Sequence, residues 1–259
     1  GKISIEECIR ILGEINPKSP EMKVYSRLIP MYAALSLNQF TRLRAMSEDV
    51  ILNRITTQNY VYYSYKSRYM LLLANCCFSS NDLKKAREYA KYGINNSNVK
   101  RIIFFSYLTY GTTLMFSDYS SAKEIFLKGM EIAKGNDFYE QQIKRSLCFL
   151  ENVWNKENQY LNIESNEIMD KQEVIHYLIR KGNIDEAKRM LEQIEKLHHD
   201  DYELGMHFYL KGLIDNSQSH FLRSIKHFKI SGDKFSTTLP IIELEKLGLD
   251  KAILDVLTL

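Results

Sequence analysis

Asn75 is the side chain whose surroundings most directly raise a question of chemistry. It stands in the run MLLLANCCF, residues 70–78, as an amide among apolar and small residues. On a helix, with about 100° between successive residues, four polar side chains fall within roughly 60° of one another: Ser64, Arg68, Asn75 and Ser79. A buried amide needs a hydrogen-bond partner. The stripe therefore predicts either a groove whose ligand Asn75 binds, or a bond from Asn75 to a nearby loop or backbone group.

Side chains that could catalyse a reaction or bind a metal show no recognisable spacing. The motifs G-x-S-x-G, H-E-x-x-H, G-x-G-x-x-G and the Walker loop do not occur. The cysteines form no C-x-x-C pair, and those in the apolar run are expected to be structural thiols; they are Cys8, Cys76, Cys77 and Cys148. The HHDD run at 198–201 has no second cluster at ligand spacing. We expect no enzyme activity, no metal and no cofactor.

Composition and charge limit the possible partners. The chain has 259 residues, of which 45% are hydrophobic, and a net charge of +3. Because its basic residues alternate with acids, we do not expect it to bind nucleic acid on its own. No run of 18 or more apolar residues occurs, and the first residues, GKISIEECIR, lack the features of a signal peptide. A cytoplasmic location with no membrane contact is therefore expected.

Four segments repeat one pattern, in which a polar turn is followed by a small residue and an amphipathic helix. The small residues are Ala86, Ala122, Ala187 and Ser224, at separations of 36, 65 and 37 positions. A period of about 34 is typical of tetratricopeptide helix pairs, and 65 is close to twice that value. More apolar helices are expected between them, near 58–78, 99–116, 138–157, 165–181 and 201–214. The pattern predicts an all-α, tetratricopeptide-like α-solenoid of stacked helical hairpins, irregular after the 138–157 helix.

Stacked hairpins form a concave groove lined by the first helix of each pair, and such grooves bind extended peptides. We assign residues 1–245 to this peptide-binding solenoid and residues 246–259 to a C-terminal capping or dimerisation segment. The final stretch LGLDKAILDVLTL is apolar where a terminal repeat is usually polar. It either folds over the last repeat or meets a second copy of the chain through Ile253, Val256, Leu257 and Leu259.

Six long segments of the chain are distinctive: NPKSPEMKVYSRL, FFSYLTYGTTLMFSDYSSA, LCFLENVWNKEN, ESNEIMDKQE, YELGMHFYLKG and SGDKF. They resemble the AimR family of arbitrium peptide receptors from temperate phages of bacilli. The resemblance implies a homodimeric transcription regulator of the lysis-lysogeny decision that loses operator binding when it binds a short peptide ending in Arg-Gly-Ala. It also implies an N-terminal helix-turn-helix domain, which does not precede Gly1 here. We expect operator DNA to be bound only through that domain.

The resemblance also implies which residues contact the peptide. The family's positions correspond to Asn75, Arg101, Gln172, Glu173, Asp233 and Phe235, and more weakly to Thr112 and Ser79, where relatives carry Asn. In this interpretation, Arg101 binds the terminal carboxylate, Glu173 and Asp233 bind the cationic groups, and Asn75 binds a peptide bond.

Each of these residues also has an ordinary structural explanation. Arg101 could be a surface residue at a helix end, Glu173 a solvated carboxylate, and Asp233 the cap of a turn. The alternative function is a tetratricopeptide-like scaffold that binds a protein partner without sensing any peptide.

Overall fold

The computed structural model describes residues 5–37, 39–48, 52, 55–56, 59–197 and 200–258. Within these ranges the chain forms fourteen α-helices and no strand, which confirms the all-α prediction. The helices are α1 (Ile5–Glu14), α2 (Pro20–Ser36), α3 (Phe40–Ser47), α4 (Tyr60–Ser79), α5 (Leu83–Asn96), α6 (Lys100–Thr112), α7 (Tyr119–Ala133), α8 (Asp137–Val153), α9 (Ile168–Arg180), α10 (Ile184–Ile194), α11 (Asp201–Asp215), α12 (Gln218–Ser231), α13 (Thr238–Lys246) and α14 (Lys251–Thr258).

Consecutive helices pack as hairpins, with the predicted small residues between them. Ala86, Ala122, Ala187 and Ser224 lie on α5, α7, α10 and α12, and each has no exposed surface. Because their side chains are short, the preceding helix can approach closely. In the last of these pairs, the Ser224 hydroxyl donates a hydrogen bond to the Gly205 carbonyl oxygen of α11 at 2.7 Å. The small residues thus set the contact between the two helices of a hairpin.

The predicted irregularity follows α8. This helix packs against α7 and α9, but residues 154–167 contain no helix before α9 begins. The other predicted apolar helices correspond to α4, α6, α9 and α11. The order of pairs is therefore regular on both sides of one non-helical segment.

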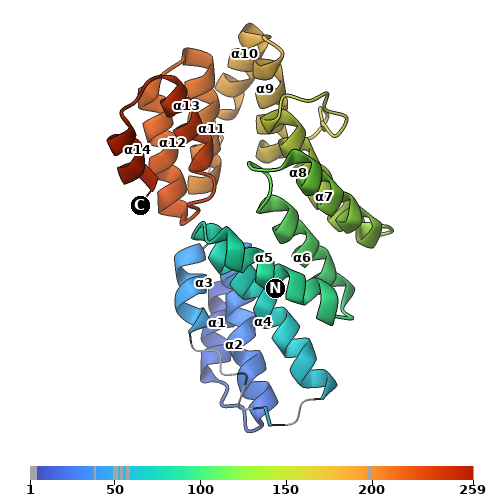
Figure 1. Cartoon of the computed structure of the whole chain (residues 1–259). Helices are drawn as coiled ribbons and strands as arrows, with labels where there is room; N and C mark the ends of the chain where they lie inside the picture. Colours follow the sequence, from blue (N-terminus) through green and yellow to red (C-terminus); the bar gives the residue numbers. More distant parts are fainter. Residues whose placement is uncertain are drawn as a thin grey trace.

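Figure 1 shows the hairpins following a curve, from α1–α3 at one end to α11–α14 at the other. The two ends of this curve meet at the turn between α12 and α13. There the Lys234 amide donates to the Ser79 carbonyl oxygen at 2.8 Å. The Phe235 ring lies 4.5 Å from that of Phe78 and 4.6 Å from that of Phe116, centroid to centroid. The turn between α12 and α13 therefore closes the arc.

Gly232 allows this close approach. Its φ of +82° is a left-handed conformation that favours glycine, and a Cβ atom there would lie 3.3 Å from Phe40 Cβ. The contact connects the end of α12 to the start of α3, which are far apart in the sequence.

The C-terminal helix α14 covers α13 and also presents an apolar face to solvent. Leu254 is buried, and the partly buried Leu257 packs against the adjoining core. The reason is helical periodicity, because residues three apart share a face. Ile253 and Val256 are 48% and 64% exposed. Leu259 lies outside the described residues.

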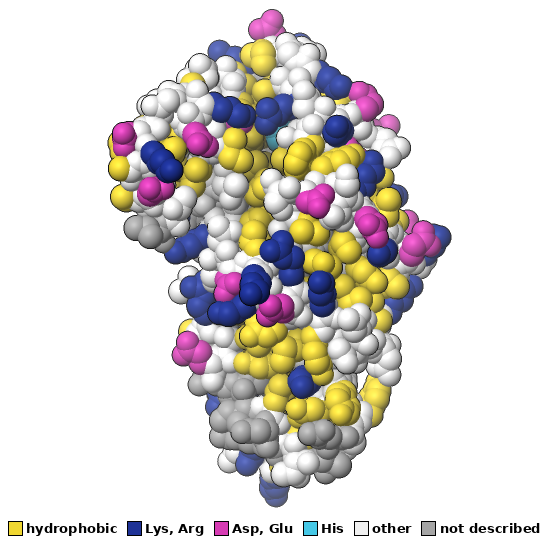
Figure 2. All heavy atoms as spheres, in the orientation of Figure 1, with side chains coloured by type: hydrophobic (Ala, Val, Ile, Leu, Met, Phe, Trp, Pro, Cys, Tyr) yellow, Lys and Arg dark blue, Asp and Glu magenta, His cyan; other side chains and the backbone are white. Residues whose placement is uncertain are grey.

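The surface supports the expectation of mixed, solvated helix faces. Figure 2 shows lysine and arginine side chains gathered across the middle of one face, where Figure 1 draws α5, with acidic side chains among them. Lys85 forms one such pair with Asp82 at 3.1 Å. In the part of the chain that the structure describes, no helix is both long and apolar enough to cross a membrane.

Candidate functional site

A cavity of about 370 Å³ lies inside the closed arc. Its walls come from several elements that are distant in sequence: α3, α4, α6, α8, α9, α11 and the turn between α12 and α13. Five of the eight predicted peptide-contacting residues line it, namely Thr112, Gln172, Glu173, Asp233 and Phe235. The other wall residues include Phe78, Arg145, Phe149, Tyr202 and Met206. The cavity combines an apolar lining with two carboxylates.

Glu173 is the carboxylate with an oxygen left over for a ligand. Its Oε2 accepts a hydrogen bond from Asn152 Nδ2 at 2.7 Å. None of the described residues donates a hydrogen bond to Oε1. Burial raises the pKa of Glu173 to about 8, the Asn152 hydrogen bond opposes that rise, and the charge of Asp170 adds to it. A half-buried carboxylate with a raised pKa is stabilised by an added cation.

Asp233 uses its oxygens to cap the turn between α12 and α13. Oδ1 accepts from the Phe235 amide at 2.9 Å and the Ser236 amide at 3.2 Å, and Oδ2 accepts from the Ser236 hydroxyl at 2.7 Å. Asp233 is only 3% exposed, and burial raises its pKa. The structural explanation considered for this residue therefore applies, while its charge still faces the cavity.

Gln172 and Thr112 make bonds within the protein. Gln172 is buried, and its Nε2 donates to the Glu203 carbonyl oxygen of α11 at 2.9 Å. The Thr112 hydroxyl donates to the Leu108 carbonyl oxygen of its own helix at 2.8 Å. Gln172 therefore connects α9 to α11 by a hydrogen bond, and the hydroxyl of Thr112 is already bonded within its own helix.

The remaining three predicted residues lie outside this cavity. Asn75 Nδ2 donates to the Leu71 carbonyl oxygen at 2.9 Å, which is the backbone bond considered as the alternative to a ligand. Ser79 is fully buried and its hydroxyl donates to the Cys76 carbonyl oxygen at 3.1 Å. Because Ser79 has no exposed surface, it does not face an open groove.

Arg101 is exposed at the beginning of α6. Its guanidinium carbon lies 5.8 Å from the ring centroids of both Tyr32 and Phe105. With a rise of 1.5 Å per residue, eleven residues of α6 separate it from Thr112 by roughly 16 Å. A six-residue peptide in extended form spans roughly 20 Å. One short peptide can thus reach from Arg101 to the cavity.

Arg145 belongs to the cavity wall and pairs with Asp170, which lines a neighbouring cavity; neither residue was predicted. Arg145 donates from Nε and Nη2 to the two carboxylate oxygens of Asp170, at 2.6 and 2.9 Å. Although burial alone would raise it, the Arg145 pair holds the pKa of Asp170 below its usual value. No spacing pattern distinguishes them, because Arg145 and Asp170 stand among other charged residues on helices α8 and α9.

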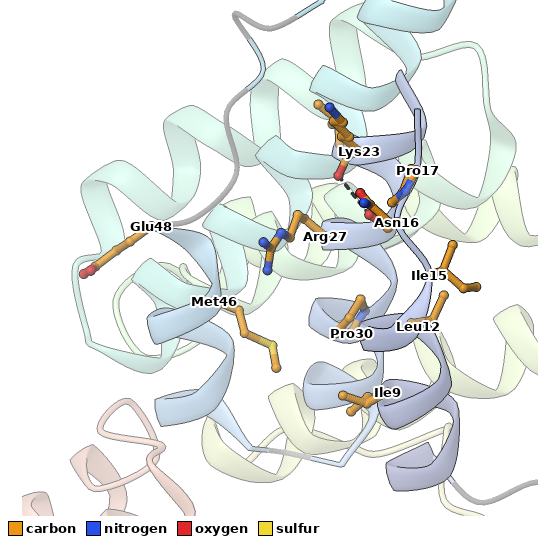
Figure 3. A pocket seen from close by; sticks show the side chains of 13 residues that line it. Ile9, Leu12, Ile15, Asn16, Pro17, Lys23, Arg27, Pro30, Met46 and Glu48 are labelled. Carbon is orange, nitrogen blue, oxygen red and sulfur yellow. Dashed lines mark hydrogen bonds between the residues drawn. The ribbon is translucent and has the colours of Figure 1, made fainter. Parts of the chain in front are cut away.

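A second cavity, of about 660 Å³, lies between α1, α2 and α3 (Figure 3). Its lining includes the apolar side chains Ile9, Leu12 and Ile15 together with Lys23 and Arg27. It holds none of the predicted peptide-contacting residues. We therefore place the candidate site in the smaller cavity, where the carboxylates converge.

The possible ligands of a metal ion within the described residues are His, Cys, Asp and Glu side chains. No group of three or more potential ligands is found among the residues that the structure describes. Of the HHDD run, His198 and His199 lie outside those residues.

The comparisons with known proteins agree on one family. A model described as "AimR transcriptional regulator-like" matches residues 1–246. The chain is 40% identical over 253 residues to the AimR transcriptional regulator of Bacillus phage SPbeta, covering 98% of this chain and 66% of that protein. It is 38% identical over 258 residues to the AimR transcriptional regulator of Bacillus phage phi3T, covering 100% of this chain and 68% of that one. The chain thus spans about two thirds of the length of these relatives.

Two solved structures share the fold. The one named "Structure of phAimR-Ligand" matches with a TM-score of 0.86 and 38% identity, over 95% of this chain and 72% of that chain. "Structure of SeMet-phAimR" matches with a TM-score of 0.83 and 38% identity, over 99% of this chain and 67% of that chain.

Proposed function

This chain belongs to the AimR transcriptional regulator family, whose members are regulators and not enzymes, and from that premise we propose that it is the peptide-sensing part of such a regulator. The ligand is a short signalling peptide ending in Arg-Gly-Ala, bound in the groove of a tetratricopeptide-like superhelix formed by residues 1–245. The observation that carries the proposal is the convergence of Thr112, Gln172, Glu173, Asp233 and Phe235 on one cavity.

The charges along the groove suit such a peptide. Arg101 binds the terminal carboxylate, and Glu173 binds the arginine guanidinium, with the charge of Asp233 supporting it. The arginine of the peptide stands two residues before its C-terminus. Roughly 7 Å of peptide backbone and the extended arginine side chain together bridge much of the distance between Arg101 and the cavity. Asn75 binds a peptide group after giving up its bond to Leu71. Each charge-assisted hydrogen bond contributes about 1.5–3 kcal/mol.

Regulation follows from the closure of the arc. A peptide that touches α4, α6 and α9 together with the turn between α12 and α13 stabilises the contact between Lys234 and Ser79. In a homodimer formed through Ile253 and Val256 of the segment 246–259, that closure changes the spacing of the two DNA-binding domains that the family resemblance implies. Operator binding requires a fixed half-site spacing. The peptide thereby shifts the lysis-lysogeny decision in the cytoplasm of the host bacterium.

Calorimetric titration of this chain with hexapeptides ending in Arg-Gly-Ala tests the proposal. At least one peptide is expected to bind, and a peptide of the same composition with a scrambled terminus is not. Arg101→Ala is expected to weaken binding about tenfold or more. A chain that gives no binding heat with any of these peptides, yet remains folded, contradicts peptide sensing and favours a scaffold for a protein partner.

A further inference from the structure

A buried side-chain amide connects the middle of the non-helical segment 154–167 to α8. Asn158 is 8% exposed. Its Nδ2 donates to the Cys148 carbonyl oxygen at 2.9 Å and to Asn152 Oδ1 at 2.8 Å. Its Oδ1 accepts a hydrogen bond from the Tyr160 amide at 3.0 Å. Both ends of the Asn158 amide are therefore used, one toward the segment and one toward α8.

Asn152, at the end of α8, continues this chain of hydrogen bonds to the cavity. It is 1% exposed, and its Nδ2 donates to Glu173 Oε2 at 2.7 Å and to the Glu173 carbonyl oxygen at 3.0 Å. A rotation of the amide by 180° would place its oxygen against the two oxygens of Glu173 and its nitrogen against Asn158 Nδ2. Asn158 therefore fixes the orientation in which Asn152 acts as a donor to Glu173.

We propose that Asn158 and Asn152 form an amide relay that positions the Glu173 carboxylate, with Oε1 directed to the cavity, for the cationic group of the ligand. The relay makes the irregular segment 154–167 part of the binding site although it does not line the cavity wall around Asp233. Both asparagines are positioning residues, since neither is assigned a contact with the peptide. The identity of the ligand rests on the proposed function, whereas the effect of the relay on Glu173 does not.

Asn152 is the described residue that donates a hydrogen bond to this carboxylate. The Arg145 guanidinium nearby is engaged by Asp170. The titratable and charged groups that face Glu173 from the packed elements are Arg145 and Cys148 of α8, Asp170 of α9, Tyr202 and Tyr209 of α11, and Asp233 of the turn between α12 and α13. Burial and the charge of Asp170 both oppose ionisation of Glu173, whereas the Asn152 hydrogen bond favours it. Removal of Asn152 therefore destabilises the charged form of Glu173.

The first experiment needs no peptide. The carboxyl carbon of Glu173, assigned with Glu173→Gln, is titrated by NMR in the wild type, Asn152→Leu, Asn158→Leu and a control, Thr109→Val. Thr109 is buried on α6 and donates to the Phe105 carbonyl oxygen, so its change removes a buried hydroxyl outside the relay. The apparent pKa of Glu173 is expected to rise by about one unit in Asn152→Leu. It should rise less in Asn158→Leu and not at all in Thr109→Val.

The second experiment measures affinity for an N-acetylated hexapeptide ending in Arg-Gly-Ala, in which no group titrates between pH 6 and pH 9.5. Asn152→Leu is expected to bind about tenfold more weakly at pH 7, with a smaller deficit at pH 9.5. In a Glu173→Gln background, Asn152→Leu should not lower the peptide affinity further, because the relay acts through Glu173.

The outcomes separate the two proposals. An unchanged Glu173 pKa in both asparagine variants, or an undiminished affinity loss in the Glu173→Gln background, overturns the relay. If Asn152→Leu does not fold, Asn158→Leu decides both measurements. A shifted pKa in a protein that binds no such peptide supports the relay and contradicts the proposed function.

Discussion

The two ends of the proposed groove hold their charges in different ways. At the acidic end, Glu173 and Asp233 line the cavity inside the arc and accept hydrogen bonds from Asn152 and Ser236. At the basic end, Arg101 is exposed and rests on the rings of Tyr32 and Phe105. The acidic end is held in place by the fold, while the basic end can adjust to a ligand.

This difference has an energetic consequence. Burying carboxylates costs stability, and the raised pKa of Glu173 shows that the folded protein favours its neutral form. An exposed arginine on aromatic rings carries little such cost, but its attraction for an anion is screened by salt. We therefore expect substitutions at the acidic end to change both stability and binding, and those at the basic end to change binding alone.

The largest effect is expected for Asp170→Ala. The change leaves Arg145 without its partner in a pair of which Asp170 is 4% and Arg145 21% exposed. Breaking a buried pair in this way costs about 3–5 kcal/mol, which denaturant unfolding measures. Glu124→Ala is the control, because its pair with Lys128 is exposed and should contribute less than about 1 kcal/mol. Equal losses in the two variants would show that the Arg145–Asp170 pair beside the acidic end contributes no more to stability than a surface pair.

Glu173→Gln separates the two roles of the acidic end. Loss of the charge is expected to weaken peptide binding by about 1.5–3 kcal/mol, roughly 10- to 150-fold. The free variant should be more stable than the wild type at high pH. Since the pKa of Glu173 in the folded state, about 8, lies above its usual value of 4.5, wild-type stability falls as pH rises between these values. Thermal unfolding at pH 5 and pH 9 should show the variant's advantage growing with pH.

Arg101→Ala tests the basic end. Binding is expected to weaken by about 1.5 kcal/mol or more, while the free energy of unfolding changes by no more than about 0.5 kcal/mol, as is usual for exposed positions. The peptide affinity of the wild type should fall with added salt more steeply than that of the variant. A substantial loss of stability in Arg101→Ala would mean that this end is also part of the rigid framework.

The smallest effect is expected for Asn75→Ala. Asn75 already bonds the Leu71 carbonyl oxygen, so the ligand replaces one hydrogen bond by another. We expect a loss of about 0.5–1.5 kcal/mol in peptide binding and little change in stability. Calorimetry with the same peptide measures this loss, and an effect as large as that of Glu173→Gln would contradict the ranking of the two ends.

The helices and their pairing could be predicted from the sequence because they depend on local patterns. Ala86, Ala122, Ala187 and Ser224 marked the helix crossings, and apolar periodicity marked α4, α6, α8, α9 and α11. The closure of the arc by Lys234 and Phe235 could not be predicted, because it depends on the accumulated curvature of many stacked helices. The resemblance, and not the spacing, suggested Glu173 and Asp233.

The relay residues were missed for another reason. Asn152 and Asn158 stand in ENVWNKENQY, where an asparagine usually indicates a loop or a helix end. Only their burial and their mutual hydrogen bond distinguish them from surface amides. Leu257 is partly buried because the periodicity of α14 turns it toward the core, and its part in dimerisation stays a prediction.

The most direct test pairs each end of the peptide with its end of the groove. A hexapeptide ending in Arg-Gly-Ala, its C-terminal amide, and the analogue with citrulline in place of arginine are titrated into the wild type, Arg101→Ala and Glu173→Gln. Amidation of the peptide should lower the affinity of the wild type about tenfold and leave that of Arg101→Ala unchanged. Replacement of arginine by citrulline should lower the affinity of the wild type about tenfold and leave that of Glu173→Gln unchanged. If amidation still weakened binding to Arg101→Ala, or citrulline still weakened binding to Glu173→Gln, by the same factor as in the wild type, a groove that binds the peptide through one basic and one acidic end would be contradicted.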